Sequence, residues 1–297
     1  MGVTGPGVTG MPVPVWVALA EVEHTIRFVD VGGWRTRILT AGDGDAVPVV
    51  LMAGTGGHLE AYAHNIAALA ADRRVIAYDY PGHGYSTTAT SDLEIGAYVE
   101  HLLGLLAVLG IDRAHLCGES LGGWVAIKVA AAHPGRVARL VLNTPGGTMA
   151  TPEVMERIRS LSQAAADDPT PERVRARLEW LMADPATVTD ELVAIRRAIY
   201  SRPGFATSMR HILCLQDPAI RRRNLVTAPE LASIAAPTLV VWTSDDPSGP
   251  AGAGMDMAAG IPDGRFELII GAGHWPQWEQ HATFNRLVGG FLATQGI

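Results

Sequence analysis

The sequence predicts an α/β fold, with an eight-stranded, mostly parallel sheet covered by helices and a helical cap inserted after the sixth strand. Short continuous apolar runs, such as Pro48–Met52, are typical of strands buried on both faces. These runs alternate with helical stretches, which indicates right-handed crossovers between parallel strands. From about Thr151 to Thr227 helical spacing continues without a convincing buried strand, which indicates an insertion.

Composition excludes several classes of protein. The 297 residues correspond to about two domains of ~150 residues, or to one large fold with an insertion. The formal net charge is −7 and the chain has no Lys/Arg-rich run, so nucleic acid is a poor candidate partner. The 2 cysteines, Cys117 and Cys214, allow at most one disulfide, which excludes a disulfide scaffold.

The N-terminal stretch is apolar at Met11–Ala20 but does not fit a targeting or membrane segment. Residues 1–20 contain no Lys or Arg, whereas a signal peptide begins with a positively charged region. The stretch is also shorter than the ~20 apolar residues that span a bilayer. We therefore expect residues 1–22 to form an arm that docks on a neighbouring subunit, and the protein to be cytoplasmic with no membrane contact.

The remaining chain divides into a first core part (23–148), the cap (149–227) and a second core part (228–297). In the first part, Ile26–Val31 and Trp34–Thr40 flank Gly32-Gly33, a pattern typical of a hairpin. The other predicted strands are Pro48–Met52, Arg74–Tyr80, Ala114–Cys117, Val137–Asn143, Thr238–Trp242 and Arg265–Ile270. Predicted helices cover 59–71, 93–109, 121–132, 152–166, 171–183, 188–200, 204–222 and 276–293.

The most informative motif is Gly118-Glu119-Ser120-Leu121-Gly122, a G-x-S-x-G sequence that directly follows a predicted strand and opens a predicted helix. This context predicts a sharp turn that holds the serine, in a strained conformation, above the sheet. Glycines are needed where strand and helix pass too closely for a Cβ. The helix N-terminus would favour an anionic intermediate. The alternative interpretation is a helix cap at Ser120 with incidental glycines.

A serine hydroxyl needs a base to become a nucleophile. After such a turn the partners follow in the order serine, acid, histidine. Asp246 follows the seventh predicted strand and His274 follows the eighth, within Gly271-Ala272-Gly273-His274. The sequence therefore predicts a triad of Ser120, Asp246 and His274. Asp245 is the alternative acid, although a capping or solvated role suits it better.

Acyl transfer also needs donors for a developing oxyanion. We predict the backbone N–H groups of Leu121 and Thr55, because Leu121 follows the nucleophile and Thr55 lies in the glycine-rich loop after the third strand. Gly54 and Gly56 would let this loop approach the substrate. A phosphate-binding loop is disfavoured by the glycine spacing. No metal-ligand motif or nucleotide fingerprint is found, so we predict a small-molecule substrate, no metal and no cofactor.

Together these residues resemble the α/β-hydrolase superfamily over about residues 24–295. The resemblance rests on the serine turn, the order of the triad and the D-x-P-G-x-G-x-S sequence at 79–86. Gly273–Glu279 (GHWPQWE) is similar to the G-H-W-x-Q-W-E of the meta-cleavage product hydrolases. Members of that family split a C–C bond in 2-hydroxy-6-oxo-2,4-dienoates, which are ring-fission products of aromatic degradation.

The resemblance implies further roles. Arg196 of the cap would bind the substrate carboxylate, Trp275 would pack on the substrate, and His274 would move the enol proton to carbon. It also implies a homodimer or larger homo-oligomer. The chain departs from the family pattern at Ala53, where histidine is usual, and at Glu119, where asparagine is frequent. A carboxylate at residue 119 would raise the pKa of His274 or hold a water molecule.

Two alternatives to this function stay open. A carboxylic ester or lactone hydrolase would use the same triad, but a neutral ester has no need of Arg196. Separately from that choice, the alternative interpretation of Arg196 or Arg197 is a solvated cap residue, and that of Trp275 is an ordinary core aromatic. A ligand sensor with little turnover is the second alternative, and nothing in the sequence indicates the protein partner that it would need.

Overall fold

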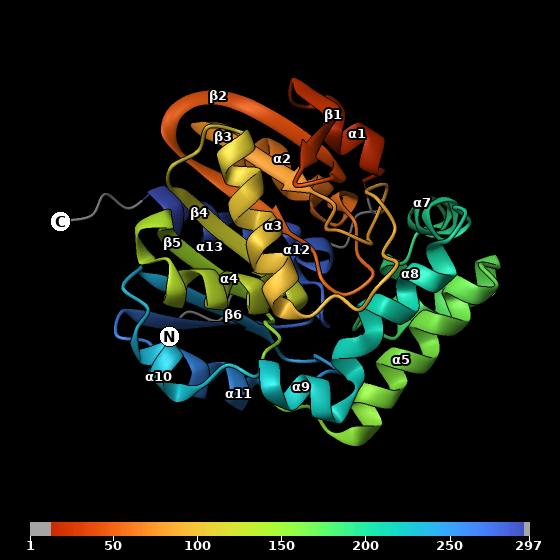
Figure 1. Ribbon diagram of the computed structural model, residues 1–297. Helices are drawn as coiled ribbons and strands as arrows, with labels where there is room; N and C mark the ends of the chain where they lie inside the picture. Colours follow the sequence, from red (N-terminus) through yellow and green to blue (C-terminus); the bar gives the residue numbers. More distant parts are fainter. Residues whose placement is uncertain (1–12, 294–297) are drawn as a thin grey trace.

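The computed structural model describes residues 13–293. Their centre is a seven-stranded sheet in the order β1-β2-β4-β5-β6-β7, with β3 paired to β2 (Figure 1). β1 is antiparallel to β2, and β4 to β7 are parallel to their neighbours. The strands are His24–Val31 (β1), Trp34–Met52 (β2), Arg73–Tyr78 (β3), Ala114–Glu119 (β4), Val137–Asn143 (β5), Thr238–Thr243 (β6) and Gly264–Ile269 (β7).

The difference between eight predicted and seven observed strands lies in β2, which joins the predicted second and third strands. Its last four residues run beside β3 from Val49↔Val75 to Met52↔Tyr78, whereas Ile38–Ala41 pairs with the same β3 residues in reversed order. β2 therefore bends around β3 and contributes two segments to the sheet. The predicted hairpin is confirmed, with Gly32 and Gly33 at φ +59° and +86° between β1 and β2.

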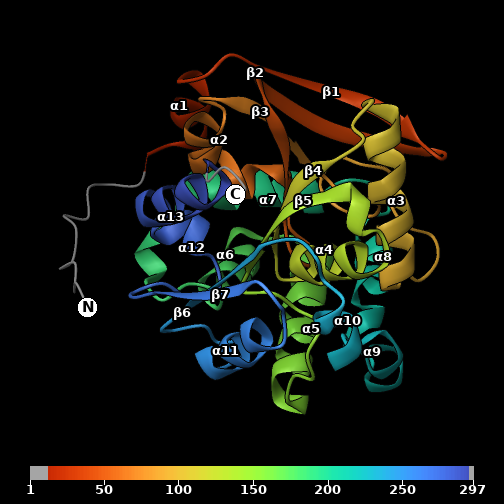
Figure 2. The same cartoon turned by 90° about the vertical axis from the view of Figure 1, so that its left-hand side faces the viewer.

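The central strands are buried on both faces, as their continuous apolar runs predict. In β2, Val49 and Leu51 join one hydrophobic cluster, whereas Val50 and Met52 join the other. This alternation follows from the two-residue repeat of a strand. Figure 2 shows helices on both sides of the sheet. Helices on these two sides include Ala63–Leu69 (α2), Ile95–Val108 (α3), Leu121–Ala132 (α4) and His281–Ala293 (α13).

Five helices between β5 and β6 form the cap: Pro152–Asp167 (α5), Pro171–Glu179 (α6), Asp190–Tyr200 (α7), Phe205–Ile212 (α8) and Pro218–Asn224 (α9). Side chains of Thr151, Thr170, Thr189 and Asp217 cap four of these helices, and proline follows three of the four caps. Such caps satisfy backbone N–H groups that have no partner within the helix. The continuous helix predicted at 204–222 is wrong, because Pro218 cannot continue a helix and begins a new one.

Short helices complete the fold: Val15–Ala20 (α1), Ala228–Ala232 (α10), Ala251–Ala259 (α11) and Pro276–Glu279 (α12), with 3-10 turns at Leu59–Tyr62, Pro134–Arg136, Pro185–Thr187 and Leu213–Gln216. The predicted helices at 59–71 and 276–293 are therefore each divided into two pieces. Among residues 13–293 no helix is long and apolar enough to cross a membrane.

The described part of the N-terminal arm docks on its own chain, whereas we expected a neighbouring subunit. α1 packs on α2, with Val15, Ala18 and Leu19 buried. The Val15 N–H donates to Glu191 of cap helix α7 over 2.7 Å. α1 therefore connects the core to the cap. Residues 1–12 of the predicted arm lie outside the described residues.

Candidate active site

Ser120 occupies the sharp turn that the sequence predicts between β4 and α4. Its backbone has φ +51° and ψ −111°, a conformation that non-glycine residues rarely adopt. The flanking glycines have no space for a side chain. A Cβ on Gly118 would lie 2.2 Å from the Gly122 carbonyl carbon, and one on Gly122 would lie 2.3 Å from the Met52 carbonyl oxygen. Strands β2 and β4 and helix α4 therefore meet too closely for side chains at residues 118 and 122. The glycines allow this close contact, and it holds the serine in its turn.

This contact predicts the effect of Gly122→Ala on stability. The new Cβ would meet backbone that cannot rotate away, so we expect the free energy of unfolding to fall by about 1–3 kcal/mol. Gly289→Ala in α13 is the matched control, because a Cβ there meets nothing within 4 Å. It should stabilise the helix by up to about 1 kcal/mol. Urea unfolding measures both, and equal midpoints for Gly122→Ala and the unmodified protein would contradict the close contact.

His274 is paired with Asp246, and this pair follows the order predicted. The His274 Nδ1 atom lies 3.0 Å from both carboxylate oxygens of Asp246. Ser248 supports the pair, because its N–H donates to Asp246 Oδ1 over 2.8 Å and its hydroxyl lies 3.2 Å from His274 Nδ1. Asp245, the alternative acid, is exposed and accepts a hydrogen bond from the hydroxyl of Ser244. The structure thus places Asp246, and not Asp245, against the histidine.

The other ring nitrogen of His274 faces a second carboxylate. Nε2 lies 3.2 Å from Oε1 of Glu119, which is 1 % exposed, and the second Glu119 oxygen accepts the Gly54 N–H over 2.5 Å. Burial alone would lower the pKa of His274, but Asp246 and Glu119 outweigh it and raise this pKa to about 10. Within residues 13–293 no hydrogen bond joins Ser120 to His274 in this state.

The loop that carries His274 is fixed to the cap. The His274 N–H donates to the Leu181 carbonyl over 2.6 Å, and a Cβ on Gly273 would lie 2.3 Å from that same oxygen. The Glu279 carboxylate accepts N–H groups from both sides: Gly273 in the loop, and Ala183 and Asp184 in the cap. The cap therefore positions the histidine as well as covering the serine.

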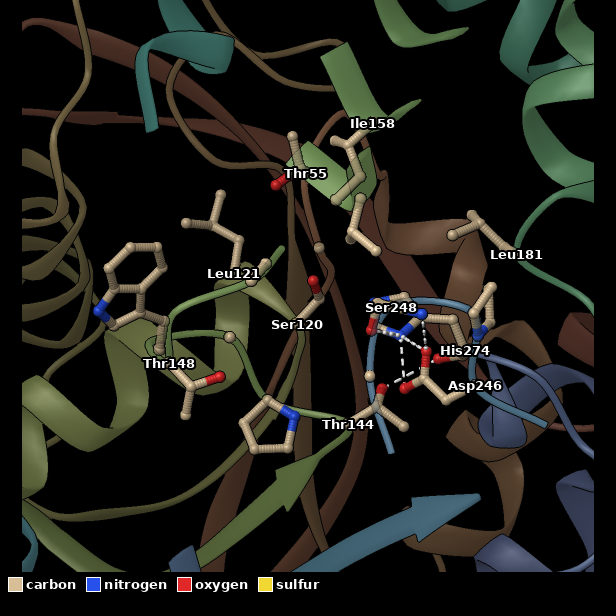
Figure 3. A pocket seen from close by; sticks show the side chains of 18 of the residues that line it. Thr55, Ser120, Leu121, Thr144, Thr148, Ile158, Leu181, Asp246, Ser248 and His274 are labelled. Atoms are coloured by element: carbon tan, nitrogen blue, oxygen red, sulfur yellow. Dashed lines mark hydrogen bonds and ion pairs between the residues drawn. The ribbon is translucent and has the colours of Figure 1, made fainter. Parts of the chain in front are cut away.

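A cavity of about 530 Å³ opens over Ser120 between core and cap. Seven of the predicted site residues line it: Gly54, Thr55, Ser120, Leu121, Asp246, His274 and Trp275. In Figure 3 Ser120 lies between Leu121 on one side and the His274–Asp246 pair on the other. Cap residues Ile158 and Leu181 contribute to the apolar wall, and Trp124 and Trp242 contribute from the core. The cavity is large enough for a small organic substrate.

Two predicted site residues lie outside the cavity lining. Gly56 contacts the cap instead, and its carbonyl accepts a hydrogen bond of 3.2 Å from the Tyr200 hydroxyl. Arg196 is 1 % exposed and packs with its guanidinium 5.2 Å from the centre of the Trp275 ring. Its Nε and Nη2 atoms have no hydrogen-bond partner among the described residues. Arg196 is therefore a buried cation beside a residue that lines the cavity, and the interpretation as a solvated cap residue is wrong.

Sequence reasoning missed a second cap arginine. Arg177 lines the cavity, is 3 % exposed, and donates from Nε to Ser162 over 2.8 Å. Its Nη1 atom has no hydrogen-bond partner among the described residues, and burial lowers the pKa of this arginine to about 10. A signal was present in the sequence, since Arg177 occupies the buried face of α6 with Val174 and Leu178.

Known proteins resemble this chain in sequence and in structure. A family model described as the alpha/beta hydrolase fold matches residues 47–280. The chain is 34% identical over 275 residues to a 2-hydroxy-6-oxononadienedioate/2-hydroxy-6-oxononatrienedioate hydrolase of Comamonas testosteroni, with 91% of this chain and 95% of that protein covered. It is 35% identical over 276 residues to a 2-hydroxy-6-oxo-6-phenylhexa-2,4-dienoate hydrolase of Burkholderia cepacia, with the same coverage.

Solved structures similar to this chain include enzymes of the same kind. A mutant of the meta-cleavage product hydrolase from Pseudomonas fluorescens superposes with a TM-score of 0.78 at 28% identity. That match covers 92% of this chain and 98% of the other. The sequence match and the structural match each cover about nine tenths of this chain.

Proposed function

We propose the activity of this chain from one premise: it belongs to the α/β-hydrolase family. We infer that it is a serine-dependent hydrolase that splits a C–C bond in a 2-hydroxy-6-oxo-2,4-dienoate formed by ring fission of an aromatic compound. The named activities of its relatives support this substrate class. The observation that carries the proposal is the buried arginine beside Trp275.

Arg196 supports an anionic substrate because its charge has no carboxylate partner in the described part of the chain, residues 13–293. Its guanidinium is 1 % exposed and leaves Nε and Nη2 unpaired within the described residues. A buried unpaired charge is unfavourable, and a guanidinium binds a carboxylate through two parallel hydrogen bonds. The C1 carboxylate of a dienoate would supply that partner, provided that binding opens the cavity past Trp275 to Arg196, which does not line it in this state. A neutral ester would leave the charge unpaired, which disfavours the esterase alternative.

The geometry accounts for the remaining steps. His274, oriented by Asp246, transfers a proton to carbon 5 of the bound dienolate, which yields the 2,6-diketone. Ser120 then attacks the C6 ketone while His274 takes its proton. The N–H groups of Leu121 and Thr55 would hold the oxyanion, whereas the Gly54 N–H already donates to Glu119. Cleavage of the C5–C6 bond leaves an acyl-enzyme, which water hydrolyses to a carboxylic acid.

The first test is spectrophotometric. Purified protein is mixed with yellow 2-hydroxy-6-oxo-dienoates that differ at C6, and the loss of dienolate absorbance is followed beside cleavage of a nitrophenyl ester. Rapid bleaching with slow ester cleavage, and formation of the two acids, would support C–C hydrolysis. Brisk ester cleavage without bleaching would favour the ester or lactone alternative.

Arg196→Met tests the carboxylate site. Loss of a buried ionic partner costs about 2–5 kcal/mol, so kcat/KM for dienoates should fall by roughly 10²-fold, mostly through KM. A neutral ester should lose much less. The matched control is Arg197→Met, because Arg197 is exposed and donates only to the Pro169 carbonyl among the described contacts. Equal losses on dienoate and ester would assign Arg196 a structural role.

Two further expectations stay predictions. The first is a cytoplasmic location, and the second is assembly into a homodimer or larger homo-oligomer.

A further inference from the structure

We propose that Glu119 is a positioning residue that keeps a proton on Nε2 of His274 in the resting enzyme, so that the histidine acts first as an acid and only afterwards as the base for Ser120. This inference rests on the proposed function for its substrate and on the geometry of Glu119 for its mechanism. It assigns a role to the residue at which the chain departs from the family's asparagine.

The geometry is that of an imidazole enclosed between two carboxylates. Asp246 lies 3.0 Å from Nδ1 and Glu119 lies 3.2 Å from Nε2. Side chains of both acids are at most 1 % exposed, so water does not screen them. A neutral imidazole would direct one nitrogen lone pair at a carboxylate oxygen, which is repulsive. Protons on both ring nitrogens satisfy both carboxylates, so this geometry favours the imidazolium.

The surroundings of His274 contain no competing cation in contact with the ring among the described residues. The loop after β6 contributes Asp246 and the Ser248 hydroxyl, and the end of β4 contributes Glu119. The cap contributes the Leu181 carbonyl, which accepts the backbone N–H of His274. The two carboxylates are thus the charged groups that face the ring. Their attraction outweighs the effect of burial and raises the pKa of His274 to about 10.

Such a histidine suits a dienolate better than an ester. Serine attack on an ester requires a neutral imidazole at the start, because the ring must accept the serine proton. A dienolate instead arrives with negative charge on its C2 oxygen and needs a proton at carbon 5. Transfer of the Nε2 proton to that carbon gives the diketone and leaves His274 neutral. The same nitrogen can then accept the Ser120 proton.

The proton transfers through His274 balance over one turnover. After serine attack, His274 returns its proton to the C2 oxygen as the C5–C6 bond breaks and 2-hydroxypenta-2,4-dienoate leaves. It next takes a proton from the attacking water and returns it to Ser120 as the acyl-enzyme collapses. The released carboxylic acid finally gives its proton to His274. One water is consumed, and the histidine ends as the imidazolium that Glu119 and Asp246 stabilise.

Glu119 also connects this proton to the oxyanion loop. Its second oxygen accepts the Gly54 N–H over 2.5 Å, and a Cβ on Gly54 would lie 2.6 Å from both carboxylate oxygens. Glycine at residue 54 is therefore what allows the acid to reach between the loop and His274. One buried side chain thus fixes the loop that carries Thr55 and contacts the ring nitrogen that would accept the Ser120 proton.

The test is Glu119→Gln, with His274 observed directly. The amide keeps the shape and can still accept one hydrogen bond, but it removes the charge. NMR of the His274 ring in the ligand-free protein should show a protonated ring up to about pH 9 in the unmodified enzyme. In Glu119→Gln the midpoint should fall by more than about one pH unit. Asp245→Asn is the control, since Asp245 is a neighbouring carboxylate that does not contact His274.

The rates of ester cleavage and of dienolate loss provide a second test of the Glu119→Gln variant. The acid limb of the ester-cleavage profile should move to lower pH in Glu119→Gln, and the rate at neutral pH should rise about tenfold for each pH unit by which the His274 midpoint falls. In a single turnover, loss of dienolate absorbance should slow about tenfold for each pH unit above the lowered His274 midpoint, because the neutral ring has no Nε2 proton to give.

The proposal is overturned if His274 titrates near its ordinary value of about 6.5 in the unmodified protein, or if its midpoint is the same in the unmodified protein and in Glu119→Gln. If no dienoate is consumed but the His274 midpoint still falls in the variant, Glu119 holds the proton as proposed and it is the substrate assignment that fails.

Discussion

Ser120→Ala should lower turnover of a 2-hydroxy-6-oxo-dienoate by at least about 10³-fold, while the yellow dienolate is still converted to its keto tautomer. The separation of the two effects follows from the geometry. The proton for carbon 5 comes from His274, which is held by Asp246 and Glu119 and makes no hydrogen bond to the serine among the described residues. Only the later C–C cleavage requires the Ser120 oxygen.

Stopped-flow absorbance and product analysis measure the two steps separately. Absorbance reports loss of the dienolate, and chromatography reports the carboxylic acid released after cleavage. Ser248→Ala is the matched control, because Ser248 contacts the far side of His274 at Nδ1 and not the cavity face of Nε2. The Ser248→Ala variant should lose less than about tenfold in the rate of acid formation, which is the scale of one neutral hydrogen bond. Near-full acid formation by Ser120→Ala would exclude a serine nucleophile.

Local patterns predicted the parts of the site that neighbouring residues determine. The turn around Ser120 could be predicted because Gly118 and Gly122 flank the serine between a strand and a helix, and their close contacts are those the motif implies. The order of Ser120, Asp246 and His274 could be predicted because each follows a predicted strand at the same sheet edge. Apolar runs indicated buried strands for the same reason, since burial on both faces leaves a continuous signal.

Features that depend on residues far apart in the chain were not predicted. The bend of β2 around β3 requires the reversed pairing of Ile38–Ala41, which no local pattern encodes. The sequence raised the possibility that Glu119 acts on His274, but the contact joins residues 155 positions apart and needed the fold to place it. Arg177 was missed because a charged residue in an amphipathic helix is usually solvated, whereas the cap buries this one over the cavity.

Asp246→Asn should reduce turnover by about 10³–10⁴-fold, whereas Asp245→Asn should change it by less than about twofold. Both Asp246 oxygens lie 3.0 Å from His274 Nδ1, and Oδ1 also accepts from the Ser248 N–H, so Asp246 fixes both the ring orientation and the proton on Nδ1. Asp245 is exposed and accepts from Ser244 only among the described side chains. Steady-state rates of both variants, with circular dichroism to check folding, decide which aspartate is the acid.

Because Glu119 contacts the other nitrogen of His274, the Asp246→Asn variant should affect the two steps of the reaction differently. With Asn at residue 246, Nδ1 no longer faces a carboxylate whereas Nε2 still faces Glu119. The neutral ring that forms after Nε2 has given its proton to carbon 5 would therefore exchange its remaining proton, through water, from Nδ1 to Nε2. That tautomer cannot accept the Ser120 proton. The Asp246→Asn variant should therefore still bleach the dienolate but release little acid, and adding Glu119→Gln should restore part of the acid formation by freeing Nε2. If the double variant is no faster than Asp246→Asn alone, the two carboxylates do not compete for the same proton.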